Sequence, residues 1–144
     1  MPGKKKEQSH AHKDAMLLRK KGNKHFSEQH YEKALAAYKD ASLCEPRNAA
    51  FFLLQAETLL HLQRSQEALL AYNQAIALDP ESNEAYLKKG DLLYELKRFE
   101  EALSAYDQAL LLDPGDRRAY AGKGNLLYEL GYIEEAVYLF EKMP

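Results

Sequence analysis

The fold of this chain is decided by the stretch NEAYLKKGDLLYELKRFEEALSAYDQALLLDPGD, residues 83–116. Its apolar residues recur three and four positions apart in two runs, as on the buried faces of two amphipathic helices. The polar pair Lys97 and Arg98 separates the runs and has the length expected of a link in an antiparallel helical hairpin. Asp113-Pro114 marks the exit, because proline disfavours the α conformation of the residue before it. The stretch therefore predicts one helical hairpin.

The same pattern returns every 34 residues, which predicts the repeats 15–48, 49–82 and 83–116 and a shorter one, 117–144. Small residues recur at the eighth place of each repeat, as Gly22, Ala56, Gly90 and Gly124. Large ones recur at the twenty-fourth place, as Tyr38, Tyr72, Tyr106 and Phe140. One such hairpin is too small to bury its own apolar face, so neighbouring hairpins must share a core. We therefore predict an all-α fold of stacked hairpins.

These columns resemble the tetratricopeptide repeat, a family with Gly at the eighth place, an aromatic at the twenty-fourth and a late Pro. The resemblance covers residues 15–144, and His25 departs from it by replacing an aromatic or aliphatic residue. It implies a right-handed α-solenoid of antiparallel helical hairpins that acts as a non-catalytic interaction scaffold. It also implies that the first helices of the repeats line a concave groove, which receives an extended peptide or a helix of a partner protein.

Candidate binding residues lie at the places of the first helices that the three-to-four spacing directs to one face. This face mixes apolar anchors with charges of both signs, which is typical of surfaces that bind another chain. Three leucines of the second repeat are expected to form an exposed apolar strip there. The candidate residues are Arg19, Asn23, Phe26, Leu53, Leu54, Glu57, Leu60, Leu87, Lys88, Asp91, Tyr94, Arg118, Asn125 and Tyr128.

An alternative function comes from a subclass of the family, co-chaperones that grip the C-terminal carboxylate of heat-shock chaperones with two Asn and three Lys or Arg. Arg19 and Asn23 match the first two places of that clamp, and Lys88 keeps the charge of another. However, Leu54 stands where the second Asn belongs, and Glu84 stands where a Lys belongs. A glutamate there would repel a carboxylate, so the sequence favours a different ligand.

Motifs for catalysis, metals or cofactors are missing from the sequence. No nucleophile motif, phosphate-binding loop or dinucleotide fingerprint occurs, so we expect no enzyme and no cofactor. His10 and His12 are the closest histidine pair, which is too few ligands for a metal site, and we expect none. Cys44 is the single cysteine and occupies an apolar column, so we expect it to be a small core residue.

Charge divides the sequence unevenly. Residues 1–24 carry eight Lys or Arg against two acidic residues, and the remaining 120 residues carry a net charge of −8. Residues 25–144 are too acidic to form a good surface for nucleic acid. No apolar run is long enough to cross a membrane. Residues 1–14 are polar and lack the apolar centre of a secretory signal, so we expect a basic, disordered leader and a cytoplasmic protein.

The end of the fourth repeat predicts a further contact. Repeat arrays normally cover the last apolar face with a polar helix. Here Tyr120, Leu127, Val137 and Phe140 have no following hairpin in the sequence. We therefore expect self-association through the last hairpin, or a longer protein of which this chain is a part.

Overall fold

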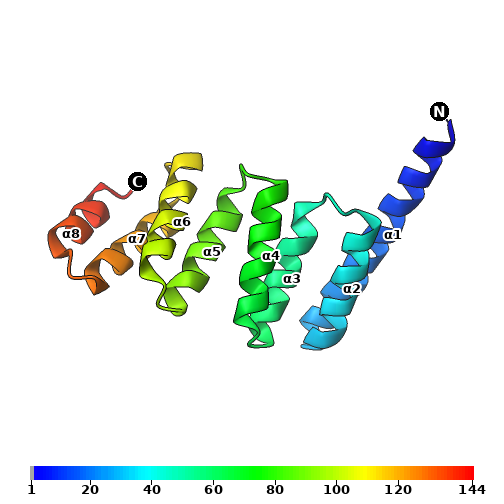
Figure 1. Ribbon diagram of the computed structural model, residues 1–144, viewed down its shortest axis with the longest axis horizontal. Coiled ribbons are helices and arrows are strands. Elements are labelled where there is room, and N and C mark those ends of the chain that lie inside the picture. Colours follow the sequence, from blue (N-terminus) through cyan, green and yellow to red (C-terminus); the bar gives the residue numbers. More distant parts are fainter. Residues whose placement is uncertain (1) are drawn as a thin grey trace. The chain divides into compact units, whose positions relative to one another are not determined.

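The computed structural model describes residues 2–144 and contains helices but no strands over that range (Figure 1). The expected all-α class is confirmed. The helices are α1 (Pro2–Ser27), α2 (Tyr31–Cys44), α3 (Ala49–His61), α4 (Ser65–Leu78), α5 (Asn83–Glu95), α6 (Phe99–Leu112), α7 (Arg117–Glu129) and α8 (Ile133–Lys142).

The helices belong to two compact units, one ending at Asp79 and one beginning at Pro80. In the first unit α1 packs on α2, α2 on α3, and α3 on α4. In the second unit α5 packs on α6, α6 on α7, and α7 on α8, while α5 also contacts α7 directly. The first helices of neighbouring hairpins therefore lie next to each other in the second unit, where they share one face.

Small and large residues meet in the hairpins as their columns predict. A Cβ atom added at Gly22 would lie 2.5 Å from the Tyr38 ring, and one at Gly124 would lie 2.6 Å from the Phe140 ring. The glycines therefore allow the two helices of a hairpin to approach closely. A Cβ atom added at Gly122 of α7 would likewise lie 2.6 Å from the Tyr106 ring of the preceding hairpin. The aromatic of one hairpin thus fills the space towards the next one.

Each hairpin turns in the same way. The residue at the fifteenth place has a positive φ, 61° at Gln29 and 60° at Lys97, for example. The next N–H donates to a carbonyl five residues back, as His30 does to His25 at 2.8 Å. This pattern is the Schellman motif, which satisfies the last carbonyls of a helix and brings the side chains on either side of the turn together.

Polar side chains cap the starts of the first helices in the second, third and fourth hairpins. The side chain of Asn48 accepts a hydrogen bond from Ala50 N at 3.1 Å, and Asp116 accepts one from Arg118 N at 3.0 Å. Ser82 caps α5 in the same way. These caps fix the starts of α3, α5 and α7, which coincide with the starts of the expected repeats.

The N-terminal segment differs from the sequence prediction. Instead of a disordered leader over residues 1–14, the described part of that segment continues α1 back to Pro2. Its Lys, Glu, Gln and Ala residues are good helix formers, and they extend a helix that is already nucleated by packing. His12 Nδ1 lies 2.5 Å from Glu45 Oε1, which links the segment to the end of α2. Met1 lies outside the described residues.

Candidate functional site

The second unit contains a hollow on the face shared by its first helices. Its volume is about 380 Å³, and it has an excess of acidic side chains, so we name it the acidic hollow. Helices α5 and α7 each contribute three of its lining residues, and α6 contributes one tyrosine. It is lined by Asp91, Tyr94, Glu95, Tyr106, Arg118, Gly122 and Asn125.

Asp91 is held in the acidic hollow by the buried tyrosine behind it. The Tyr106 hydroxyl donates to Asp91 Oδ1 at 2.7 Å. Although Asp91 remains open to solvent overall, partial burial of its carboxylate raises its pKa, against the opposing effect of that hydrogen bond. Burial and the same hydrogen bond raise the pKa of Tyr106. A cation that approached the Asp91 carboxylate would therefore stabilise its charged form.

Arg118 is the basic residue of the acidic hollow, and acidic partners already hold it. Its guanidinium lies 2.9 Å from Glu84 Oε2 and 3.1 Å from Asp116 Oδ2. Hydrogen bonds to Asp116 and Glu84 raise its pKa. Lys88 Nζ lies 3.7 Å from the other oxygen of Glu84. Arg118 and Lys88 are thus both paired with acidic side chains of the same unit.

Tyr94 stands at the edge of the acidic hollow. Its hydroxyl donates to Glu129 Oε1 at 2.8 Å, and this hydrogen bond raises its pKa. Its ring lies 5.9 Å from that of Phe99. The ring is therefore fixed on both sides and offers a rigid apolar surface beside two carboxylates.

The first unit repeats the central hydrogen bond of the acidic hollow with a neutral partner. The Tyr38 hydroxyl donates to Asn23 Oδ1 at 2.6 Å. Burial raises the pKa of Tyr38, Glu57 raises it further, and Arg19 lowers it. The side chains predicted on α1 and α3 therefore converge around one tyrosine hydroxyl.

Aromatic rings of three helices meet nearby in the first unit. The His61 ring stacks on Tyr31 with centroids 4.6 Å apart, and Phe26 meets His61 edge-on at 5.1 Å. Phe26 is thus partly buried by contacts within its own unit. This cluster stiffens the end of the predicted face of α1.

Several predicted binding residues are less available than the sequence suggests. Leu87 is only 3 % exposed and belongs to the core, so its placement on the binding face was wrong. Leu54 packs against a core cluster around Phe51, which Cys44 also contacts. Leu53 and Leu60 are partly buried as well. The expected apolar strip is therefore largely covered by the repeat itself.

Some of the predicted residues of the second unit line the acidic hollow, and others do not. Tyr128 is exposed but does not line the acidic hollow. Asp91, Tyr94, Arg118 and Asn125 line it together. Sequence periodicity therefore predicted four side chains that line one hollow, while the depth of each side chain depends on packing that the periodicity does not contain.

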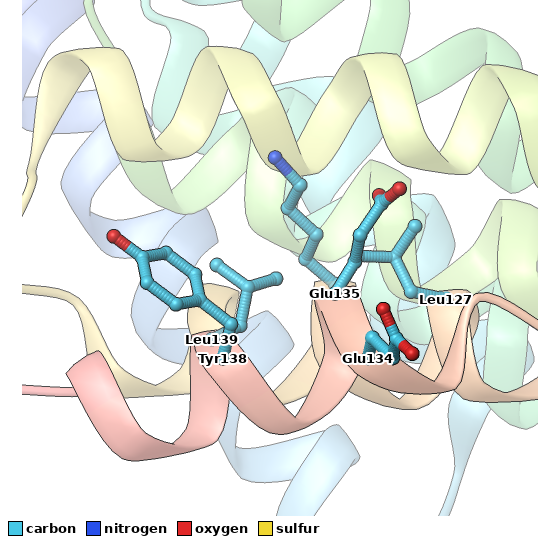
Figure 2. Close-up of a pocket in the computed structure, with 6 residues that line it drawn as sticks. Leu127, Glu134, Glu135, Tyr138 and Leu139 are labelled. Carbon is cyan, nitrogen blue, oxygen red and sulfur yellow. The ribbon is translucent and has the colours of Figure 1, made fainter.

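A second hollow, of about 330 Å³, lies between α7 and α8. Figure 2 shows Glu135 and Tyr138 rising from α8 on the side where Leu127 of α7 lies. Next to it, Val137 and Phe140 of α8 are 47 % and 39 % exposed. The last hairpin therefore presents apolar surface to solvent.

One group of side chains was missed by the sequence analysis. Within residues 2–144, His25, Glu28 and His30 are the one group of three His, Cys, Asp or Glu side chains whose ligand atoms all lie within 4.8 Å of one another. The sequence analysis weighed His10 with His12 instead. Alignment of the repeats could have indicated the group, because His25, Glu28 and His30 all differ from the residues at the same places of the other repeats. Only the departure at His25 was part of the prediction.

No helix over residues 2–144 is both long and apolar enough to cross a bilayer.

The sequence matches the family model of the tetratricopeptide repeat over residues 19–83 and 87–144. The chain belongs to the tetratricopeptide repeat family. Tetratricopeptide repeats form scaffolds for protein–protein interaction, and the helical hairpins described above have that architecture. No curated protein matches the sequence.

Solved structures of tetratricopeptide repeat domains are similar to this chain. The TPR domain of Arabidopsis OM64 has a TM-score of 0.77 at 25 % identity, covering 83 % of this chain and 98 % of that one. The crystal structure of MamA has a TM-score of 0.84 at 25 % identity, covering 90 % and 75 %. The first TPR of Spaghetti (RPAP3), bound to the HSP90 peptide SRMEEVD, has a TM-score of 0.77 at 27 % identity, covering 83 % and 94 %.

Proposed function

We propose that this chain is a non-catalytic interaction module that binds an extended or helical segment of a partner protein on the faces formed by its first helices. The observation that carries the proposal is the acidic hollow. Its volume of about 380 Å³ lies within the range of ligand sites. It offers a fixed aromatic ring, Tyr94, beside polar groups that can set the orientation of a bound chain.

The charges of the acidic hollow favour a basic segment. Asp91 and Glu95 face the hollow, and the guanidinium of Arg118 is already paired with Glu84 and Asp116. A Lys or Arg side chain of the partner would find carboxylates there, whereas an acidic side chain would be repelled. The Tyr94 ring can contact the aliphatic part of such a side chain or receive its charge on the ring face.

The experiment is selection of a randomised peptide library on the purified chain, followed by titration of the enriched peptides. We expect enrichment of peptides with Lys or Arg next to an apolar residue, and weaker binding by Asp91→Asn. Glu100→Gln is the matched charge control, because Glu100 is exposed on α6 and does not line the acidic hollow. Enriched peptides that bind Asp91→Asn and wild type equally would contradict the proposal.

Docking of a chaperone C-terminus is the alternative function. Its support is the similarity to the RPAP3 domains, whose structures contain the HSP90 peptide SRMEEVD and the HSP70 peptide SGPTIEEVD. In this chain Arg19 and Asn23 are exposed at the first two places of the clamp. Leu54 is partly buried at the second Asn place, and Lys88 is paired with Glu84. These two features weaken the alternative.

A matched peptide pair separates the two functions. SRMEEVD with a free C-terminus and its amidated twin differ only in the terminal carboxylate. We expect both to bind weakly and alike, as judged by fluorescence anisotropy. Tight binding of the free acid alone, lost in Asn23→Ala, would establish carboxylate docking instead.

Self-association is a second candidate function, favoured by the last hairpin. Val137 and Phe140 are 47 % and 39 % exposed, whereas Leu35 and Tyr38, which hold the same places in the first repeat, are 3 % and 1 % exposed. On α1, Leu17 is 66 % exposed, although its counterparts in later repeats are fully buried. We propose that α8 of one copy receives α1 of another, as α6 receives α7 within the chain.

The ion pair between α6 and α7 sharpens this proposal. Lys123 Nζ lies 2.6 Å from Asp107 Oδ1, and the same places are held by Lys21 on α1 and Glu141 on α8. Sedimentation velocity over a concentration series should show association that Lys21→Glu and Glu141→Lys each weaken. The double variant should restore it. A monomer at every concentration would end this proposal.

A further inference from the structure

We propose that the turn between α1 and α2 binds a divalent transition-metal ion, with Zn²⁺ as the expected ion, through His25, Glu28 and His30. This site is separate from the peptide-binding faces of the proposed function. Its three side chains come from six consecutive residues, so the end of α1 and the turn that follows it supply all three ligands. Two imidazoles and one carboxylate form a ligand set that suits Zn²⁺ and its neighbours in the first transition row.

The backbone brings the two histidines together. His25 and His30 occupy the two places of the Schellman motif whose side chains normally make an apolar contact across the turn. The N–H of His30 donates to the carbonyl of His25 at 2.8 Å, and Gln29 has the left-handed φ of 61° that closes the turn. The ring centroids are 6.2 Å apart. Glu28 precedes Gln29, so its carboxylate extends from the same turn.

The donor atoms are nearly close enough to share an ion. One ligand atom from each of the three side chains lies within 4.8 Å of the other two. His30 Nδ1 and Glu28 Oε2 are 3.5 Å apart. Bonds of about 2.1 Å at tetrahedral angles require ligand atoms about 3.4 Å apart. The ligand atoms of His30 and Glu28 already have this spacing. Rotation of these exposed side chains can bring them as close to the ligand atom of His25.

The other three hairpins show that this ligand set is not required by the fold. The place of His25 is held by leucines that are at most 5 % exposed, and the place of Glu28 is held by leucine in every other repeat. The counterparts of His25 are Leu59, Leu93 and Leu127, and those of Glu28 are Leu62, Leu96 and Leu130. The first repeat has thus exchanged apolar residues for metal ligands at two places of one turn.

The third ligand, His30, lacks the ion-pair partner that its place has in the second and third hairpins. Arg64 and Arg98 hold this place in the second and third repeats, and each forms a two-pronged ion pair with a glutamate three residues later. In the first repeat the arginine is His30 and the glutamate is Lys33. Both members of the pair changed together, so His30 is available to the turn.

His25 provides an independent indication of a ligand. Its Nδ1 atom is inaccessible to solvent and has no hydrogen-bond partner among residues 2–144. A polar atom buried without a partner costs free energy of folding, whereas the leucine of the other hairpins avoids that cost. Coordination of Nδ1 itself to a metal would supply the missing partner. The three protein ligands leave a fourth position for water, as in open zinc sites.

The experiment is calorimetric titration of the tag-free chain, first stripped with a chelator, with ZnCl₂. We expect one strong site per chain, and a change in the visible spectrum when CoCl₂ is used as the probe. His25→Leu copies the residue of the other three hairpins, and His30→Arg copies that of the second and third, so both variants should fold. Each should weaken Zn²⁺ binding by more than about tenfold, because loss of even an outer partner of a ligand costs that much.

Control variants separate this site from binding elsewhere. His10→Gln and His12→Gln alter the other histidine pair and should leave the stoichiometry and affinity unchanged. Circular dichroism of every variant establishes that the helices remain. The proposal fails if the chain binds no Zn²⁺ at micromolar concentrations. It also fails if binding survives His25→Leu and His30→Arg, or disappears with His10→Gln or His12→Gln.

Discussion

The first and third repeats make the same hydrogen bond with different chemistry. In the first, the Tyr38 hydroxyl donates to Asn23 at 2.6 Å, and in the third, the Tyr106 hydroxyl donates to Asp91 at 2.7 Å. The bond and the close packing of a glycine on the tyrosine are common to both, so they belong to the fold. The charge of the acceptor side chain differs between the two repeats, so that charge can be changed without loss of the fold. We call the shared hydrogen bond and packing the repeat frame. Residues that vary within this frame are the ones to test for function.

The largest effect is expected where the frame itself is broken. Tyr106→Ala removes a ring that is only 1 % exposed and leaves Asp91 without its donor. Removal of a buried aromatic ring costs about 3 to 5 kcal/mol of unfolding free energy, because the surrounding residues only partly fill the cavity. Urea unfolding followed by circular dichroism measures the loss.

Phe140→Ala is the matched control for that substitution. Phe140 holds the same place in the last repeat but is 39 % exposed. The expected loss is only about 1 kcal/mol at low protein concentration, because part of the ring is already in water. Equal losses for Tyr106→Ala and Phe140→Ala would contradict the packing described here.

Tyr94→Ala should have the next largest effect, on binding rather than stability. Tyr94 lines the acidic hollow, and Tyr128, its counterpart one repeat later, does not. For a basic peptide taken from the library selection, Tyr94→Ala should cost about 2 kcal/mol, or roughly thirtyfold in affinity. Tyr128→Ala should leave the affinity nearly unchanged. Similar losses for both variants would place the binding site outside the acidic hollow.

Much of this frame follows from the sequence because each of its features repeats. The hairpins, the caps at Asn48, Ser82 and Asp116, and the contact of Gly22 with Tyr38 all follow from columns that agree between repeats. The face of the first helices, on which we propose that a partner binds, follows from helical periodicity in the same way.

What the sequence did not provide was the behaviour of single residues. Leu87 has the periodicity of the binding face but is buried, because depth depends on which neighbours pack against it. The helical start of α1 was missed because its exposed, charged residues carry no apolar pattern, although their helix propensity is high. The three proposed ligands at the first turn are not adjacent in the sequence, and only the geometry of the turn brings their side chains together.

His25→Leu tests the difference between the first turn and the others in the absence of metal. The substitution replaces a side chain whose Nδ1 is buried without a partner by the residue found in the other three repeats. In the presence of chelator we expect a gain of about 1 to 2 kcal/mol in unfolding free energy. With saturating Zn²⁺ the wild type should recover part or all of that difference, since an ion that binds only the folded state stabilises it. A loss of stability in chelator would show that His25 has a purely structural role.

Asp91→Asn should have the smallest effect on stability, and its pH dependence is the informative measurement. Burial raises the pKa of Asp91 in the folded state and Glu84 adds to this, while Lys88, Arg118 and the Tyr106 hydroxyl oppose it. The folded state therefore holds more protons than the unfolded state between the ordinary Asp pKa and the raised one. Stability of the wild type falls as the pH rises through that window.

The asparagine introduced by this substitution would not titrate, but it can accept the same hydrogen bond, as Asn23 does in the first repeat. The stability of Asp91→Asn relative to the wild type should therefore increase as the pH rises through the window and remain constant above it. At neutral pH the gain should stay within the ~0.5 kcal/mol typical of surface substitutions. Urea unfolding of both proteins from acid to neutral pH measures the difference. If the wild type instead gained relative to the variant with rising pH, the carboxylate would be stabilised by its neighbours, and the acidic hollow would have less attraction for a basic partner.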